Sequence, residues 1–152
     1  MAISLNKSKR ATKVSLASDA GTTIELLKTL AEDDEYEVRG KVASNQNTPV
    51  DLLDALSKDS IYSVRRNVAA NLNTPTYILE RLARDGWSEV RVEVAANKNT
   101  PVEVLVYLSK DPYSSVRRAL QDNLNTPHEI RANAFVGLRP QDGADYYEGD
   151  DD

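Results

Sequence analysis

The chain has 152 residues, 40% of them hydrophobic, carries a formal net charge of −5 and contains no cysteine. One domain with an elongated core accounts for this length and composition, and the lack of cysteine fits a reducing compartment. No segment approaches the ~20 apolar residues of a membrane span and none resembles a signal peptide, so we expect a cytoplasmic protein without a membrane partner.

A block of 26 residues is repeated along the chain. Its copies are marked by the triplets Asn47-Thr48-Pro49, Asn73-Thr74-Pro75, Asn99-Thr100-Pro101 and Asn125-Thr126-Pro127, with a degenerate form at Gly21-Thr22-Thr23. Self-similarity at this period indicates stacked units that cannot bury their apolar faces alone. We therefore predict an all-α fold, a right-handed α-solenoid of two-helix repeats whose second helix is a short α or 3₁₀ helix.

The predicted solenoid covers residues 1–138. It divides into a half-repeat cap at 1–20, full repeats at 21–46, 47–72, 73–98 and 99–124, and a C-terminal half-repeat at 125–138. Residues 12–19 match the second helix of a unit, and 127–138 match a first helix. Half-units at both ends would cover apolar faces that otherwise meet water.

The first helices are predicted to begin at a capping box, which Thr22-Thr23-Ile24-Glu25 keeps without proline and which the third copy, with Tyr77, keeps only in part. In Thr48-Pro49-Val50-Asp51 a hydroxyl comes first, proline takes the first helical position and a carboxylate comes third. Apolar residues at helical spacing, such as Leu52, Leu53 and Leu56, then mark one buried stripe. We expect about ten residues in this helix.

The second helix is anchored by apolar residues at i and i+4, such as Val64 and Val68. A length of about eight to ten residues is short enough for part of it to be 3₁₀. We expect it to end at the asparagine that recurs in every copy, such as Asn71, in the left-handed conformation that this residue tolerates.

An aspartate and an arginine recur in step, six residues apart, in every unit. This predicted structural ladder comprises Asp33, Arg39, Asp59, Arg65, Asp85, Arg91, Asp111 and Arg117. An Asp in a turn and an Arg after it can bond within and between units and satisfy the turn amides. A groove lined for phosphates is the alternative interpretation.

The run from Asn73-Thr74-Pro75 to Leu82, with Asp85, Val90-Arg91 and Val94-Ala95-Ala96-Asn97, resembles the leucine-rich repeat variant family. That family forms helical solenoids similar to HEAT repeats, and the resemblance covers residues 21–138. It implies a HEAT-like superhelix but no particular activity, because the shared motif is a packing motif. Some members carry a cysteine cluster that resembles an iron–sulfur site; without cysteine, the resemblance implies no cofactor here.

The net charge lies mostly at the C-terminus, where residues 139–152 are predicted to be an acidic tail. Residues 141–152 hold six acidic residues and no basic one, whereas residues 1–138 hold 18 of each sign. Such a tail cannot bury enough apolar area to order itself. The neutral body lacks the basic face of a dedicated nucleic-acid binder.

Recognition is expected at exposed positions where the copies differ. On the second helices the candidates, placed opposite the buried valines by helical geometry, are Lys41, Arg66, Asn67, Val92, Glu93, Arg118 and Asp122. In the turns, along one edge of the stack, they are Tyr36, Tyr62, Trp87 and Tyr113. Tyr, Trp and Arg frequently anchor protein interfaces, although aromatic residues at this place also fill gaps between units.

These features predict a non-enzymatic scaffold or adaptor that binds another protein. One alternative is a nucleic-acid-binding repeat protein that uses Lys41, Arg66, Arg118 and the basic N-terminus. Another is an inhibitor whose acidic tail occupies the nucleic-acid groove of a partner. His128, the single histidine, and the single tryptophan favour neither a catalytic triad nor a glycosylase-like pocket. We expect no catalytic residue, cofactor or metal site.

Overall fold

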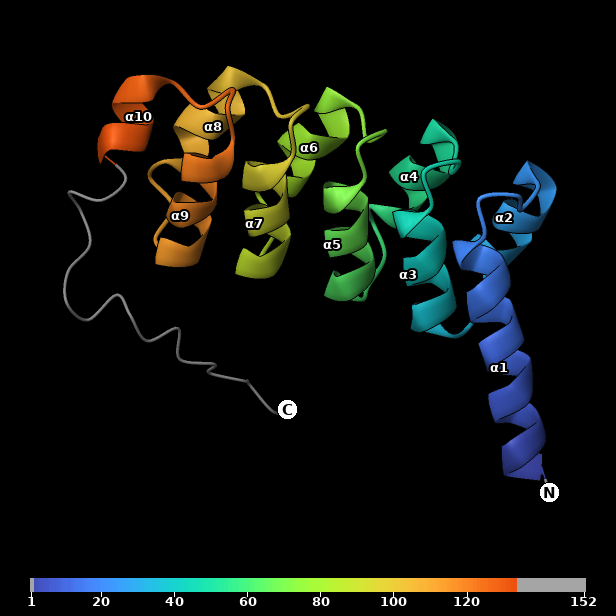
Figure 1. The fold of residues 1–152 in the computed structure, drawn as a ribbon. Helices are drawn as coiled ribbons and strands as arrows, with labels where there is room; N and C mark the ends of the chain where they lie inside the picture. Colours follow the sequence, from blue (N-terminus) through green and yellow to red (C-terminus); the bar gives the residue numbers. More distant parts are fainter. Residues whose placement is uncertain (1, 134–152) are drawn as a thin grey trace.

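The computed structural model describes residues 2–133 (Figure 1). The predicted acidic tail and the end of the C-terminal half-repeat lie outside these residues. Within them the regular elements are all helices: α1 (Ala2–Ser18), α2 (Ile24–Ala31), α3 (Tyr36–Ser44), α4 (Val50–Leu56), α5 (Tyr62–Ala70), α6 (Thr76–Leu82), α7 (Ser88–Ala96), α8 (Val102–Leu108), α9 (Ser114–Asp122) and α10 (His128–Asn133).

The helices form two layers in a curved stack, the architecture of an α-solenoid (Figure 1). The second helices of successive units, α3, α5, α7 and α9, stand side by side in one row, which α1 extends at its N-terminal end. The first helices, α2, α4, α6 and α8, form the other layer and pack far less on one another. The predicted solenoid is confirmed, whereas its right-handed sense stays a prediction.

One continuous core runs through the stack because each unit contributes the same apolar columns. The second helices bury Val38, Val64, Val90 and Val116, and one turn later Val42, Val68, Val94 and Leu120. The first helices bury Leu30, Leu56, Leu82 and Leu108. Burying one such side chain stabilises a fold by about 1.5–3 kcal/mol, so these columns account for the strict sequence repeat.

Threonine does not cap the first helices α4, α6 and α8 in the way that the capping box predicts, although Thr23 caps α2 by accepting from the amide of Leu26 at 3.4 Å. The N-cap of α4 is Pro49, and no side chain bonds the free amides of its first turn. The hydroxyl of Thr74 instead donates to the carbonyl oxygen of Val68 at 2.6 Å, and the same bond recurs in the neighbouring units. The predicted box is wrong because buried carbonyls at the end of the second helix need this donor.

The helix lengths also differ from expectation. The first helices α4, α6 and α8 have seven residues each, and α2 has eight, rather than about ten. They end early because the next amides bond carbonyls three residues back, as Asp59 does to Leu56, which tightens the chain into the turn. The second helices α3, α5, α7 and α9 have nine residues, and residues 2–133 contain no 3₁₀ helix.

The recurring asparagine ends each second helix in extended rather than left-handed backbone. Asn71 has φ −70° and ψ 125°, and no residue within 2–133 has a positive φ. Its buried Nδ2 donates to the carbonyl oxygens of Ala43 at 2.8 Å and Asn45 at 3.0 Å, both in the preceding unit. Its Oδ1 accepts from the backbone amide of Asn73 at 2.9 Å. The side chain, rather than the backbone conformation, explains this column.

We call this row, which comprises Asn45, Asn71, Asn97 and Asn123, the asparagine ladder. Each member makes the same three hydrogen bonds. Because Nδ2 satisfies two carbonyl groups of the unit before, the ladder joins neighbouring units at the end of the second helices. The asparagine ladder thus forms a polar edge along one side of the apolar core, at the C-terminal ends of the second helices.

Candidate functional site

The Arg and Asp columns form ion pairs between units at the opposite edge, which we call the arginine–aspartate ladder. Arg65 donates through Nε and Nη2 to both carboxylate oxygens of Asp85, at 2.7 and 3.0 Å. Its Nη1 donates to the backbone carbonyl of Asp59 in its own unit, at 2.7 Å. The same geometry joins Arg39 to Asp59 and Arg91 to Asp111.

These pairs are engaged within the stack. The side chains of Arg91 and Asp111 are only 9% and 5% exposed. In each bidentate pair the carboxylate occupies the edge of the guanidinium that would otherwise bind a phosphate. At the N-terminal end Lys13 takes the arginine position and pairs with Asp33 at 2.6 Å. The described pairs thus account for the two columns without a ligand, which disfavours the phosphate groove.

The ladder shifts the titration of its carboxylates. Burial raises the pKa of Asp59, but the hydrogen bonds from Arg39 and from the amide of Ile61, with the nearby positive charges, outweigh it. The pKa of Asp59 therefore lies below its ordinary value of 3.8. For Asp33, burial is outweighed in the same way by the hydrogen bond from Lys13, and its pKa is lowered too.

We expect the protein to lose stability as the pH falls below about 4, and the Asp59→Asn variant to lose less. A carboxylate whose pKa folding has lowered stabilises the native state fully above its unfolded pKa. That contribution disappears as the pH falls through the folded pKa. The midpoint of urea unfolding, followed from about pH 6 to about pH 2.5 for both proteins, checks this. Parallel curves would contradict it.

The predicted second-helix surface is only partly exterior. Lys41, Arg66, Arg118 and Asp122 are exposed. Val92, by contrast, is half-buried and packs against the core, on a helix, α7, that packs on α5 at one side and on α9 at the other. The exposed part of this predicted surface therefore consists mainly of charged side chains.

Two further candidates are engaged between units. Asn67 Nδ2 donates to the carbonyl oxygen of Gly40 at 3.0 Å, and a Cβ at Gly40 would lie 3.1 Å from that nitrogen. Glu93 is half-buried, with its carboxylate 3.9 Å from Nε of Arg66. Gly40 and Asn67 thus differ from their counterparts because they pack as a pair. The expectation that Asn67 and Glu93 face outward is corrected accordingly.

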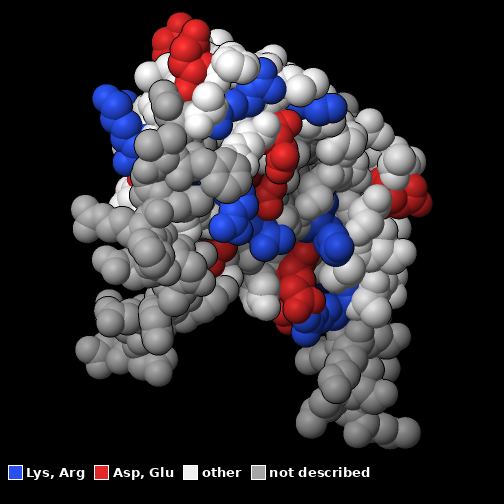
Figure 2. All heavy atoms as spheres, turned by 60° about the vertical axis from the view of Figure 1, so that its left-hand side comes forward, with Lys and Arg blue, Asp and Glu red and all other residues white. Residues whose placement is uncertain are grey.

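The charges on the second helices are interleaved rather than segregated. The exposed bases Lys41, Arg66 and Arg118 share this layer with Glu93 and Asp122. Figure 2 shows basic and acidic side chains alternating across the middle of the face that it draws. A duplex or single strand is bound by a continuous basic face, so this pattern does not favour nucleic acid.

The four aromatic candidates, Tyr36, Tyr62, Trp87 and Tyr113, lie where the second helices begin. Tyr36 and Tyr62 are the first residues of α3 and α5, and Trp87 and Tyr113 directly precede α7 and α9. We call this row, together with Ile61, the aromatic edge. Tyr36, Trp87 and Tyr113 are 46%, 47% and 44% exposed. Nearly half of the surface of each of these three residues therefore faces solvent.

The rings of the aromatic edge are held by contacts between units. Tyr62 stacks on Trp87 with ring centroids 4.3 Å apart and planes at 14°. The guanidinium of Arg91, fixed by its ion pair with Asp111, lies 5.4 Å from the centroid of the Tyr113 ring. The rings thus fill gaps between units and also present apolar surface, so both sequence-based interpretations apply to them.

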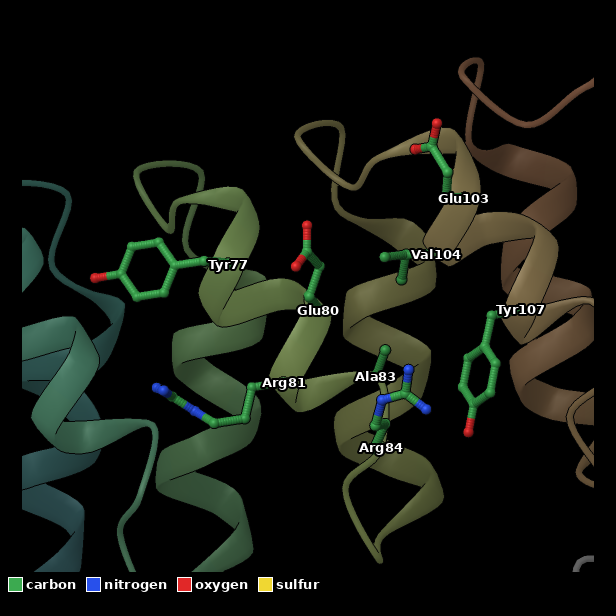
Figure 3. A pocket seen from close by; sticks show the side chains of 8 residues that line it. All are labelled: Tyr77, Glu80, Arg81, Ala83, Arg84, Glu103, Val104 and Tyr107. Atoms are coloured by element: carbon green, nitrogen blue, oxygen red, sulfur yellow. The ribbon is translucent and has the colours of Figure 1, made fainter.

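An open pocket of about 550 Å³ lies between the first helices α6 and α8 (Figure 3). Its apolar part is formed by Ala83 and Val104, which are 2% and 8% exposed. The rest of the wall is polar or aromatic, and the guanidinium of Arg84 lies 4.9 Å from the centroid of the Tyr107 ring. These remaining lining residues are Tyr77, Glu80, Arg81, Arg84, Glu103 and Tyr107. None of the pocket residues was predicted, because the candidate positions lie on the second helices and in the turns before them, whereas the pocket lies between first helices.

Comparisons with protein-family models, with curated proteins and with solved structures gave no significant match. Within the part of the chain that the structure describes, no group of three or more His, Cys, Asp or Glu side chains could hold a metal ion. None of the described helices is both long and apolar enough to cross a membrane. His128 is an exposed residue at the start of α10.

Proposed function

We propose that this protein is a non-enzymatic scaffold or adaptor that binds another protein through the aromatic edge. The supporting observation is the row of partly exposed aromatic side chains, one per unit, three of which are held by contacts between units. Rigid Tyr and Trp side chains lose little entropy on binding and are enriched among residues that dominate interface energy. The exposed charges Lys41, Arg66, Arg118 and Asp122 would form the polar rim.

We also propose that the repeat belongs to the leucine-rich repeat variant family and that the protein works in the cytoplasm. The first proposal rests on the columns that resemble that family, each of which has a packing or ladder role in this stack. The second rests on the composition of the chain, which lacks cysteine.

The proposal is tested by affinity capture with the full-length chain, followed by measurement of Kd for each protein retained. We expect Trp87→Ala to weaken binding of the true partner about thirtyfold, the value for an interface residue worth about 2 kcal/mol. Leu72→Ala is the matched control, since Leu72 is 51% exposed but lies at the other end of the second helices. It should leave Kd unchanged.

Thermal unfolding of each variant, followed by circular dichroism, separates loss of binding from loss of folding. Equal effects of Trp87→Ala and Leu72→Ala would contradict the assignment of the edge. Retention of nucleic acid rather than protein, lost at moderate salt, would contradict the class of partner.

A further inference from the structure

A guanidinium of the chain itself fills the gap between the first helices α4 and α6. Arg81, on α6, reaches back and donates from Nη2 to Oδ1 of Asp54 at 2.8 Å and to the hydroxyl of Ser57. Lys58 donates to the other carboxylate oxygen of Asp54 at 2.7 Å. These two hydrogen bonds hold the pKa of Asp54 below its ordinary value. At this register a carboxylate on one first helix therefore receives a cation from the next one.

The following gap, between α6 and α8, keeps a carboxylate at the position of Asp54 but has no cation at the position of Arg81. One repeat after Asp54, Ser57 and Arg81 stand Glu80, Ala83 and Tyr107. The tyrosine ring replaces the guanidinium, and a methyl group replaces the serine hydroxyl. The counterpart of Lys58 is Arg84, which lies over the Tyr107 ring instead of bonding Glu80. Among the described residues Glu80 has no ion pair, and the gap stays open as the pocket of Figure 3.

The walls of this pocket suit one kind of side chain. Ala83 and Val104 provide apolar surface for an aliphatic stem, and Tyr107, 48% exposed, provides a ring for a planar group. Glu80 and Glu103 bring two carboxylates to a lining that also contains Arg81 and Arg84, of which Arg81 is already bonded to Asp54. A guanidinium stacks on rings and binds carboxylates through two parallel hydrogen bonds, which an ammonium does not.

We propose that the pocket between α6 and α8 binds an arginine side chain of a protein partner, which takes the place that Arg81 occupies in the preceding gap. The site lies on the first helices and contains no residue of the aromatic edge. It therefore adds a second recognition surface to the proposed function. Its test is independent of the partner that the edge binds.

The probe is N-acetyl-arginine N-methylamide, titrated into the full-length protein while the methyl signals of Ala83 and Val104 are followed by NMR. We expect saturable shifts with a Kd in the millimolar range, as for a small ligand in an open pocket. Glu80→Gln should weaken binding about fivefold or more, because it removes the charge-assisted hydrogen bond. The neutral citrulline analogue and the lysine analogue should bind about fivefold or more weakly for the same reason.

The variant Tyr107→Arg provides a second, independent check. It places an arginine at the position that Arg81 has in the preceding repeat, and the new side chain should occupy the pocket. Probe binding should then disappear while the Tm does not fall. Glu25→Gln is the matched control, since Glu25 is exposed on α2, away from this gap, and should leave Kd unchanged. The proposal is overturned if citrulline binds as well as arginine, if Glu80→Gln leaves Kd unchanged, or if no methyl signal of the pocket shifts.

Discussion

The Arg91→Ala variant is expected to lose about 3–5 kcal/mol of unfolding free energy, the cost of removing one partner from a buried ion pair. Arg91 donates to both carboxylate oxygens of Asp111 at 2.6 and 3.0 Å and to the carbonyl of Asp85 at 2.7 Å. Both charged side chains are more than nine-tenths buried. Without Arg91, the carboxylate of Asp111 stays in the interior with its charge uncompensated.

Urea unfolding at neutral pH measures this loss. Arg118→Ala, which removes an exposed arginine from α9, should change the unfolding free energy by no more than about 0.5 kcal/mol. If the uncompensated charge of Asp111 causes the loss, the double variant Arg91→Ala with Asp111→Asn should recover about 1 kcal/mol of unfolding free energy. The amide oxygen of the new asparagine can still accept from the backbone amide of Tyr113. A further loss would show instead that packing of the arginine dominates.

Asn97→Asp should destabilise the protein by about 3 kcal/mol or more, although the two side chains have nearly the same shape. Asn97 is 4% exposed, and its Nδ2 donates to the carbonyl oxygens of Ala69 at 2.7 Å and Asn71 at 3.1 Å. An ionised carboxylate has no proton to give to either group. It would bring a buried negative charge against two carbonyl dipoles that point toward it.

The same variant has a distinctive pH dependence. Burial and the facing carbonyls should raise the folded pKa of the new carboxyl group, so the penalty is present at neutral pH and shrinks as the pH falls through that value. The difference in urea midpoint between variant and wild type should therefore narrow toward about pH 4. Asn99→Asp is the control, because Asn99 is exposed and donates to a carbonyl at the rim, that of Leu72. Equal losses in both variants would refute the special role of the asparagine ladder.

The polar columns explain why the sequence repeats so strictly and why strict repetition is a poor guide to function. Asp, Arg, Asn and Thr recur because, inside the stack, they bond groups of a neighbouring helix or unit, and a change in one copy leaves a buried partner without its bond. The residues available for recognition are accordingly those outside the columns. Even there, burial removes some of them, as the pairing of Gly40 with Asn67 shows.

The candidate site was predictable only in part. The aromatic edge follows from the sequence, because the aromatic residues stand at the same or adjacent repeat positions in successive turns. The pocket between α6 and α8 also left a trace, since Tyr107 stands where the preceding copy has Arg81. The sequence does not show what this exchange changes, because only the structure shows that Arg81 bonds Asp54 on the preceding first helix. A comparison of copies shows that a residue changes, but it does not show what the residue touches.

The sequence by itself determined the helical repeat, the core columns and the edge along which the aromatic residues lie. It could do so because burial of an apolar face depends on the spacing of residues along one helix, which a single unit already contains. Only the tertiary structure decided the partners of the polar side chains. Arg65 bonds a carboxylate 20 positions ahead, and Asn71 bonds carbonyl groups 26 and 28 positions behind. Which partner each side chain bonds depends on how far one unit is shifted relative to the next. That shift is fixed only when the units pack, and the sequence of a single unit does not contain it.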